Sequence, residues 1–400
     1  MRSQMRWALA LLPAIALAMP AFAQVRPTTL ADPDEPGSVI IYPKFVNRAA
    51  VSVDGAVLPR TEIEIGAVCP QPGPEASPGA TCTEHQSVKV RFHWVCPGIQ
   101  STASKFVCPE TDFDVVLSIN GKLAFSADGT PINSNSPTVP NPNCPNGYLI
   151  GWVINQGDQP IKFDALVGDA ELRGPQLTAG PSAGLSTGVE SYKAITIQAD
   201  PALASGALIT TPADPSLGTP TLAFDGLPGH YQAIAGKLFG DVKFDRETAG
   251  GVPLPSNALS QTFLVLLTLD VRSNLPNLPT FVPLQFFNES LNTVSSTNPN
   301  FERLTSTSTE FLCWTQVQLT AINSNLTQVN QGTRKGGVIA GPAVKIPFNG
   351  IDDTAGKVTL IGLVQTFEGT AANAYMERSY IYNMFDDSVP VPTFFVPFPF

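Results

Sequence analysis

The stretch VKVRFHWVC, residues 88–96, alternates apolar and polar side chains over its length. Every second residue from Val88 to Trp94 is apolar, and the residues between them are Lys, Arg and His. Successive side chains of a β-strand point to opposite faces, so this stretch has one apolar and one polar face. TEIEI, residues 61–65, and TDFDVVLSI, residues 111–119, alternate in the same way. Strands with one solvated face are typical of antiparallel sheets that pack as a sandwich.

The rest of the chain also favours strands over helices. Its 400 residues include 38 Pro and 32 Gly, which disfavour long helices and favour short strands joined by turns. YLIGWV, residues 148–153, and TLIGLV, residues 359–364, are apolar on both faces and are predicted to be central strands. We therefore predict an all-β protein made of β-sandwich domains of the jelly-roll or immunoglobulin-like type.

A weak internal repeat divides the chain into two similar halves. IIYPKFVNR, residues 40–48, resembles LFGDVKFDR, residues 238–246, and their lysines, Lys44 and Lys243, are 199 positions apart. Four further pairs of segments follow in the same order: 57–65 with 253–267, 111–119 with 309–317, 148–153 with 359–364, and 190–201 with 377–390. Identities are few, and any all-β chain offers strand-like strings that can match by chance. Because order and spacing agree, we interpret the repeat as an internal duplication.

The duplication predicts two tandem β-sandwich domains behind a leader peptide. The N-terminal domain covers residues 36–200, and the C-terminal domain, which ends in a Pro/Phe-rich tail, covers residues 231–400. Residues 201–230 are rich in Pro, Gly, Ala and Ser and show no periodicity, which is typical of a linker. Each half is long enough to bury a core of ordinary size.

The two predicted copies differ on one sheet face. The outward glutamates of TEIEI align with Phe263 and Val265 in the second copy. Asp114 of the first copy aligns with Leu312, and Trp314 follows on the same predicted face. A large apolar sheet face is seldom left in water. We therefore expect these four residues of the second copy to be covered by the other domain, by the C-terminal tail or by another molecule.

Residues 1–23 are predicted to be a cleaved secretory signal peptide. Arg2 and Arg6 lie near the start of the segment, and the apolar run ALALLPAIALA follows them. The segment ends with AFA, so that the predicted cleavage site lies between Ala23 and Gln24. This run is short and interrupted by proline, and no later run of 18 apolar residues predicts a membrane span. We therefore expect export to the periplasm, the cell surface or the medium.

The mature chain is acidic and sparsely charged. Removing the leader takes two of the 23 basic residues and none of the 33 acidic ones, which leaves 21 against 33 and a formal charge of −12. Nucleic acids and anionic lipids are bound through basic patches, so neither is expected as a partner. The partner stays unknown, with a protein or a glycan at the cell surface as the two classes left open.

Six cysteines in an exported chain predict disulfides, because the compartment is oxidising. Two local pairs bracket short polar loops and are predicted to be bonded: Cys69 with Cys82, and Cys96 with Cys108. Closing loops of this length contributes on the order of 3 kcal/mol each. Cys144 and Cys313 remain, and they are either bonded across the two halves or free.

Motifs for catalysis, metals or nucleotide cofactors are weak in this sequence. Its three histidines share no metal-ligand spacing, and the alternation places His93 on a polar strand face. GLSTG, residues 184–188, matches Gly-x-Ser-x-Gly around Ser186, but the strand before the serine and the helix after it are missing. Short acidic clusters such as residues 352–353 are interpreted as turn caps rather than calcium sites. We therefore assign no catalytic residue, cofactor or metal.

These observations favour a non-enzymatic exported protein with a structural, adhesive or surface-interaction role. The alternative is a glycan-binding or glycan-cleaving protein with a calcium-stabilised sandwich. Glycoside hydrolysis needs two facing carboxyl groups and profits from an aromatic platform. A groove that gathers two carboxylates beside an exposed aromatic ring would favour the alternative.

Overall fold

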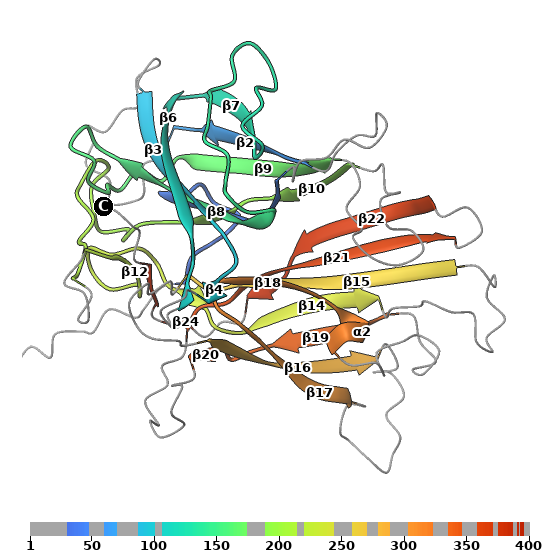
Figure 1. Cartoon of the computed structure of the whole chain (residues 1–400). Helices are drawn as coiled ribbons and strands as arrows, with labels where there is room; N and C mark the ends of the chain where they lie inside the picture. Colours follow the sequence, from blue (N-terminus) through green and yellow to red (C-terminus); the bar gives the residue numbers. More distant parts are fainter. Residues whose placement is uncertain are drawn as a thin grey trace, which may run out of the picture.

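The computed structural model contains several antiparallel β-sheets and one short helix among the residues it describes (Figure 1). The described residues are 30–47, 60–69, 87–100, 106–173, 189–213, 220–243, 258–269, 279–288, 303–322, 335–345, 358–370, 375–386, 390–391 and 393–395. The predicted signal peptide, Cys82 and Ser186 lie outside them. The prediction of an all-β protein with antiparallel sheets is confirmed.

The N-terminal half consists of strands β1 to β11, of which nine form two antiparallel sheets. The five-stranded sheet has the order β11, β1, β8, β3 and β6, formed by Ile195–Ile197, Val39–Val46, Asn146–Ile154, Ser87–Val95 and Glu110–Ser118. The four-stranded sheet has the order β10, β9, β2 and β7, formed by Val189–Lys193, Leu166–Arg173, Arg60–Ala67 and Gly121–Ser126. Strands β4 (Ile99–Gln100) and β5 (Phe106–Val107) pair with each other. Apolar residues of both large sheets form one buried cluster, so the two sheets pack against each other.

The C-terminal half consists of strands β14 to β23 and the short helix α2 (Leu319–Ile322). Its larger sheet has the order β23, β14, β19, β16 and β17, formed by Phe385–Asp386, Leu238–Lys243, Lys335–Ala340, Thr280–Asn288 and Arg303–Phe311. Strand β20 (Val344–Lys345) also pairs with β16. The four-stranded sheet has the order β22, β21, β15 and β18, formed by Tyr375–Asn383, Ile361–Thr370, Ala258–Leu267 and Trp314–Gln318. A second buried cluster joins these two sheets.

The strand orders of the two halves correspond element by element. Taken in chain order, β1, β2, β3, β6, β7, β8, β9, β10 and β11 occupy the same sheet positions as β14, β15, β16, β17, β18, β19, β21, β22 and β23. The strands that contain YLIGWV and most of TLIGLV, β8 and β21, each lie between two neighbours, as predicted for central strands.

Two parts of the predicted alignment are wrong. Residues 148–153 were aligned with 359–364, but the first segment lies in β8 and the second leads into β21, and by strand order β8 corresponds to β19 and β21 to β9. Residues 309–317 were aligned with the single strand at 111–119, but β17 ends at Phe311 and β18 begins at Trp314 in the other sheet. The chain therefore reverses at Leu312 and Cys313, and Leu312 and Trp314 do not share a strand face. By strand order, β18 corresponds to β7 rather than to the end of β6.

The C-terminal tail pairs with the predicted linker and with the first residues of the predicted C-terminal domain. Strand β12 (Leu222–Phe224) pairs with β25 (Thr393–Phe395), and β13 (Ile234–Ala235) pairs with β24 (Pro390–Val391). Leu222, Phe224 and Phe395 are fully buried in the core cluster of the N-terminal half. The tail therefore returns across the molecule to the half in which the chain begins.

The tail changes the environment of His93, which was predicted to lie on a solvated face. The His93 ring stacks on Trp152 at 4.8 Å, and the Phe395 ring meets it edge-on at 6.2 Å. His93 is fully buried, so this prediction is wrong. The polar neighbours on the same face, Arg91 among them, remain partly exposed and pair with Asp114.

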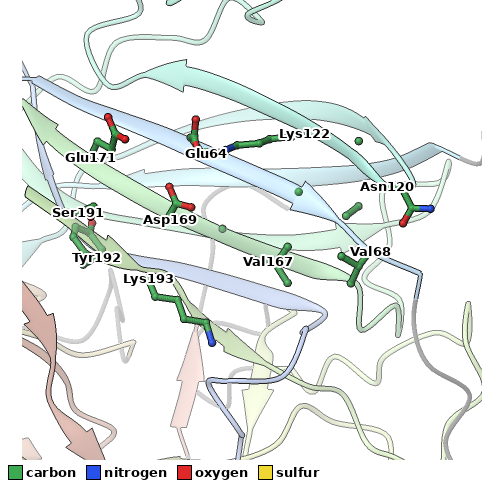
Figure 2. A pocket seen from close by; sticks show the side chains of 14 residues that line it. Glu64, Val68, Asn120, Lys122, Val167, Asp169, Glu171, Ser191, Tyr192 and Lys193 are labelled. Atoms are coloured by element: carbon green, nitrogen blue, oxygen red, sulfur yellow. Dashed lines mark ion pairs between the residues drawn. The ribbon is translucent and has the colours of Figure 1, made fainter.

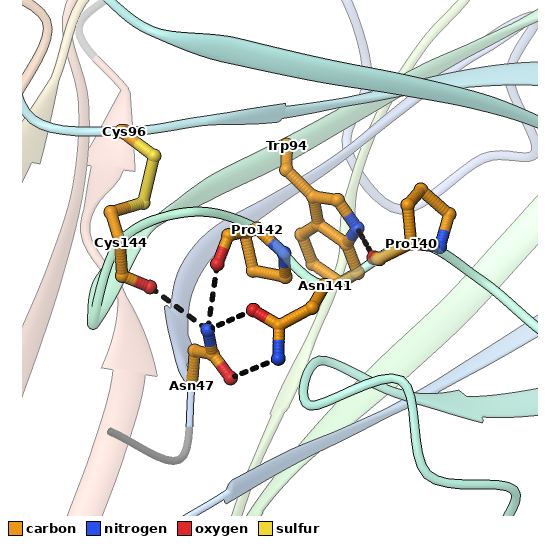
Figure 3. Close-up of a disulfide and its surroundings, with 7 residues drawn as sticks. All are labelled: Asn47, Trp94, Cys96, Pro140, Asn141, Pro142 and Cys144. Carbon is orange, nitrogen blue, oxygen red and sulfur yellow. Dashed lines mark hydrogen bonds between the residues drawn. A yellow bond between two sulfur atoms is a disulfide. The ribbon is translucent and has the colours of Figure 1, made fainter. Parts of the chain in front are cut away.

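The disulfide in the N-terminal half joins Cys96 to Cys144, so the predicted bond between Cys96 and Cys108 is wrong. The register of the sheet explains the difference: Val95 at the end of β3 lies opposite Tyr148 at the start of β8, which brings the preceding Cys144 to Cys96, with a Cα–Cα distance of 5.9 Å. Figure 3 shows the Asn47 amide beside this disulfide, where it donates to the carbonyl oxygens of Pro142 and Cys144. These contacts anchor the loop that leads into β8.

The second disulfide joins Cys108 to Cys313, across the two halves and 205 positions apart in sequence. Cys144 and Cys313 are therefore neither bonded to each other nor free, so neither of the two alternatives predicted for them is right. Cys69 is also disulfide-bonded, but the predicted partner Cys82 lies outside the described residues, and that pair stays a prediction. Among the described residues, no helix is both long and apolar enough to cross a membrane.

Candidate functional site

The contact between the two halves is the first candidate site, because it contains the apolar face singled out in the sequence. Val265 is fully buried and belongs to the core cluster of the N-terminal half rather than to that of its own half. Phe263, two residues earlier on β15, is partly buried and packs edge-on against Phe367 at 5.9 Å. The outward face of the β15 sheet is therefore covered by the other half of the same chain.

Leu312 and Trp314 reach the same contact from the chain reversal between β17 and β18. The Trp314 indole is 5% exposed, and its Nε1 donates to the Pro43 carbonyl oxygen at 2.8 Å. Leu312 lies against Gly98 so closely that a Cβ at position 98 would be 2.3 Å from the Leu312 Cβ. All four predicted interface residues thus lie in the C-terminal half, and three of them have a described contact with the N-terminal half.

A buried polar network crosses this contact. Lys44 at the end of β1 donates from Nζ to the Gln365 side-chain oxygen on β21, and the Gln365 amide donates to the Glu190 carboxylate on β10. All three side chains are at most 4% exposed. The Tyr192 hydroxyl adds hydrogen bonds with the Lys44 backbone. Gln365 of the C-terminal half therefore bridges the Lys44 ammonium and the Glu190 carboxylate of the N-terminal half.

Burial governs the protonation of Lys44. Loss of water lowers the pKa of its ammonium group to about 8, and the nearby negative charge of Glu190 opposes this shift only in part. Lys44 is therefore mostly protonated at neutral pH and neutral in mildly alkaline solution. An ammonium group at this position is stable only while its partners hold it.

Raising the pH from about 8 to about 10 is expected to stabilise the protein by about 2 kcal/mol through Lys44. In this window the folded Lys44 is neutral while the unfolded lysine still carries its proton. The unfolded state then binds more protons, so the free energy of unfolding rises with pH; below the folded pKa both states are protonated and the contribution is absent. Urea unfolding of the protein and of Lys44→Met at pH 8 and pH 10 measures this, and an equal pH response in the two would contradict it.

The second candidate site is an open groove of about 890 Å³ on the outer face of the four-stranded sheet of the N-terminal half. Figure 2 shows the carboxylates of Glu64, Asp169 and Glu171 above β2 and β9. Glu64 lies directly opposite Asp169, and Glu62 lies directly opposite Glu171. Like charges directly opposite in a sheet destabilise it, so this acidic arrangement has an energetic cost.

Basic residues at the borders of the groove offset part of that cost. Lys122 pairs with Glu64, and Arg173 Nε lies 2.8 Å from Glu62. Partial burial raises the pKa of Asp169, and the charge of Glu64 raises it further. Glu62, predicted as exposed, is only 5% exposed because these ion pairs enclose it, so that prediction is wrong.

The groove lacks part of what a sugar site needs. Tyr192 is the one aromatic residue among those that line it, and its ring is buried with the hydroxyl bound to the Lys44 backbone. No set of three or more His, Cys, Asp or Glu that could hold a metal ion occurs within the described ranges. The arrangement can attract cations or polar ligands, but it presents no aromatic platform.

Sequence reasoning singled out these four residues but gave no sign of the polar network. Lys44 served only as the marker of the repeat, and Gln365 and Glu190 lie in strands whose local pattern gives no sign of pairing with it. The pairing joins positions 321 residues apart, which no local pattern can reveal.

The chain matches no protein-family model, and no curated protein is significantly similar to it.

Proposed function

We propose that this protein is an exported, non-enzymatic structural or surface-interaction module built from two tandem copies of one β-sandwich domain. The matching strand orders of the two halves support the duplication. The two described disulfides support export, because such bonds persist in oxidising compartments. The mature chain would begin at Gln24 and act in the periplasm, at the cell surface or in the medium.

The observation that carries the proposal is the way in which the halves are joined. The face of the C-terminal half that corresponds to the open acidic face of the N-terminal half is buried, crossed by the Lys44 network and bonded through Cys108 and Cys313. Domains that open and close around a substrate need a mobile boundary between them. A covalent bond and a buried apolar contact instead favour a rigid unit, which suits a structural or adhesive role.

Fractionation of cells that produce the tagged chain tests the proposal. We expect the protein outside the cytoplasm, with a mature N-terminus at Gln24 and without alkylatable thiols before reduction. A matched variant without residues 2–23 is expected to stay in the cytoplasm with reduced cysteines. Recovery of the unprocessed full-length chain in the cytoplasm would contradict the proposed export and with it the structural role outside the cell.

The groove on the N-terminal half favours a second candidate function, the binding or cleavage of a glycan. Glu64 and Asp169 supply two carboxyl groups in an open depression, although the aromatic platform is missing. Binding of soluble oligosaccharides by isothermal titration calorimetry, with and without calcium, tests it. The control is Asp169→Asn, which should abolish binding, and an unchanged affinity in this variant would exclude the groove as the site.

A further inference from the structure

Three buried side chains at the contact between the halves bring an amine, an amide and a carboxylate together. Lys44 donates from Nζ to the Gln365 side-chain oxygen, and the Gln365 amide nitrogen donates to the Glu190 carboxylate. The Lys44 amine therefore lies one covalent bond away from the amide carbon of Gln365, and Glu190 contacts the nitrogen on the other side of that carbon. A nucleophile, a carbonyl group and a proton carrier beside the leaving nitrogen are the groups that the exchange of one amide for another needs.

The surroundings of these three groups keep water away from them. Gln365 lies on β21 between Phe263 of β15 and Ile381 of β22. Two residues earlier on the same face of β21, Leu363 is fully buried, and so is Val265 directly opposite it. Because the three polar side chains are themselves almost inaccessible to water, hydrolysis of the amide cannot compete with attack by the amine.

Burial also makes the Lys44 amine a nucleophile at a pH near neutral. A lysine attacks a carbonyl carbon only as the neutral amine, and burial lowers the pKa of Lys44 to about 8, although the charge of Glu190 opposes the shift. The Tyr192 hydroxyl, which contacts the Lys44 backbone, stays neutral because burial raises its pKa. Most of Lys44 is therefore in the reactive form in mildly alkaline solution.

We propose that Lys44 and Gln365 react to form an isopeptide bond, which joins the two halves covalently in addition to the disulfide. Neutral Lys44 Nζ attacks the side-chain carbon Cδ of Gln365, a new C–N bond forms, and the carbonyl oxygen takes up the electron pair. Glu190 accepts a proton from Nζ and delivers it to Nε2 of Gln365. The bond between Cδ and Nε2 then breaks, the carbonyl group forms again and ammonia leaves. Glu190 ends as it began, no oxidant or cofactor is consumed, and a neutral amide replaces the buried amine.

Intact-mass spectrometry of the purified and reduced chain tests the inference. Incubation at pH 9 is expected to lower the mass by one ammonia molecule, and a tryptic digest is expected to contain the peptides of Lys44 and Gln365 joined to each other. The reaction should be about tenfold faster at pH 9 than at pH 7, because the neutral fraction of Lys44 rises from about a tenth to about nine tenths. All samples carry Gln24→Ser, because an N-terminal glutamine can lose ammonia by cyclising.

Variants test the role assigned to each group. Lys44→Met and Gln365→Leu should keep their full mass, and Glu190→Gln should slow the loss of ammonia by roughly tenfold or more. The matched control is Lys193→Met on β10, which removes a surface lysine that pairs with Asp34 and should react at the unmodified rate. If these variants do not fold, the chain with the native triad still decides: full mass after days at pH 9, or a loss that maps to other residues, would overturn the inference.

The inference goes beyond the proposed function and does not rest on export, because the reaction needs no oxidising compartment. The isopeptide bond should form equally in the variant without residues 2–23, so its absence and a failure of the fractionation experiment are distinguishable. Reacted chain no longer has the titrating amine. The unfolding experiments on Lys44 therefore use chain of full mass, stored at pH 6, where roughly one Lys44 in a hundred is neutral.

Discussion

The double variant Cys108→Ser/Cys313→Ser is expected to lower the free energy of unfolding by about 5 kcal/mol. The bond closes a loop of 205 residues, and the entropy that such a cross-link removes from the unfolded chain grows with loop length. The bond is also one of the links between the halves, so its loss should separate their unfolding. Chemical unfolding followed by tryptophan fluorescence and by circular dichroism measures both effects, because the intact protein should give coincident transitions and the variant should not.

The control for this prediction is Cys96→Ser/Cys144→Ser, which opens a bond within the N-terminal half. Its loop of 48 residues is shorter, so the expected loss is about 4 kcal/mol, and the two halves should still unfold together. Equal stability of the Cys108/Cys313 variant and the unmodified protein would contradict the prediction. So would a free thiol at Cys108 in the unmodified protein under non-reducing conditions.

Much of the fold follows from local alternation. Residues 88–96 contain most of β3 with Phe92 and Trp94 fully buried, and residues 111–119 contain most of β6 with Val115 and Leu117 nearly so. A period of two in a strand fixes which side chains face the core, so the pattern alone was sufficient. This information is local, because the alternation within one strand identifies its core-facing side without reference to the neighbouring strands.

One of the failures concerns a local turn, and the others concern contacts between positions that are distant in the sequence. The reversal at Leu312 and Cys313 contains neither Gly nor Pro, so 309–317 read as one strand. Cys96 bonds to a residue set by the register of β8, not by loop length. His93 is buried by Phe395, about three hundred positions later, and the pattern around His93 carries no sign of the tail.

The comparison of sheet faces was more informative than any motif. It identified Val265 and Trp314 as residues that need a cover, and both are buried where the halves meet. Val265 lies on β15, which occupies the same sheet position as β2, the strand of the outward glutamates. For Trp314 the aligned strand was wrong, and its ring is buried in the core cluster of the N-terminal half, where its Nε1 donates to the Pro43 carbonyl oxygen.

Glu190→Gln is expected to destabilise the protein by about 1.5 kcal/mol at pH 7, because it leaves the Lys44 ammonium buried without a negative charge. Lys44 can limit this loss by releasing its proton, since its pKa is already lowered to about 8, and the loss should therefore shrink in alkaline solution. Lys44→Met/Glu190→Gln removes both charges, and the double variant should recover to within about 1 kcal/mol of the unmodified protein. Urea unfolding of the four proteins of this cycle at pH 7 gives the coupling energy.

The exposed pair of Lys122 and Glu64 provides the matched control for this cycle. Lys122 is well exposed, so Lys122→Met should cost less than about 1 kcal/mol. Similar losses in Glu190→Gln and Lys122→Met would mean that the Lys44 network contributes no more than a surface ion pair. A large coupling between Lys44 and Glu190 that disappears in Gln365→Leu would instead show that this one amide transmits the coupling, since Gln365 is the only residue of the C-terminal half in the described network.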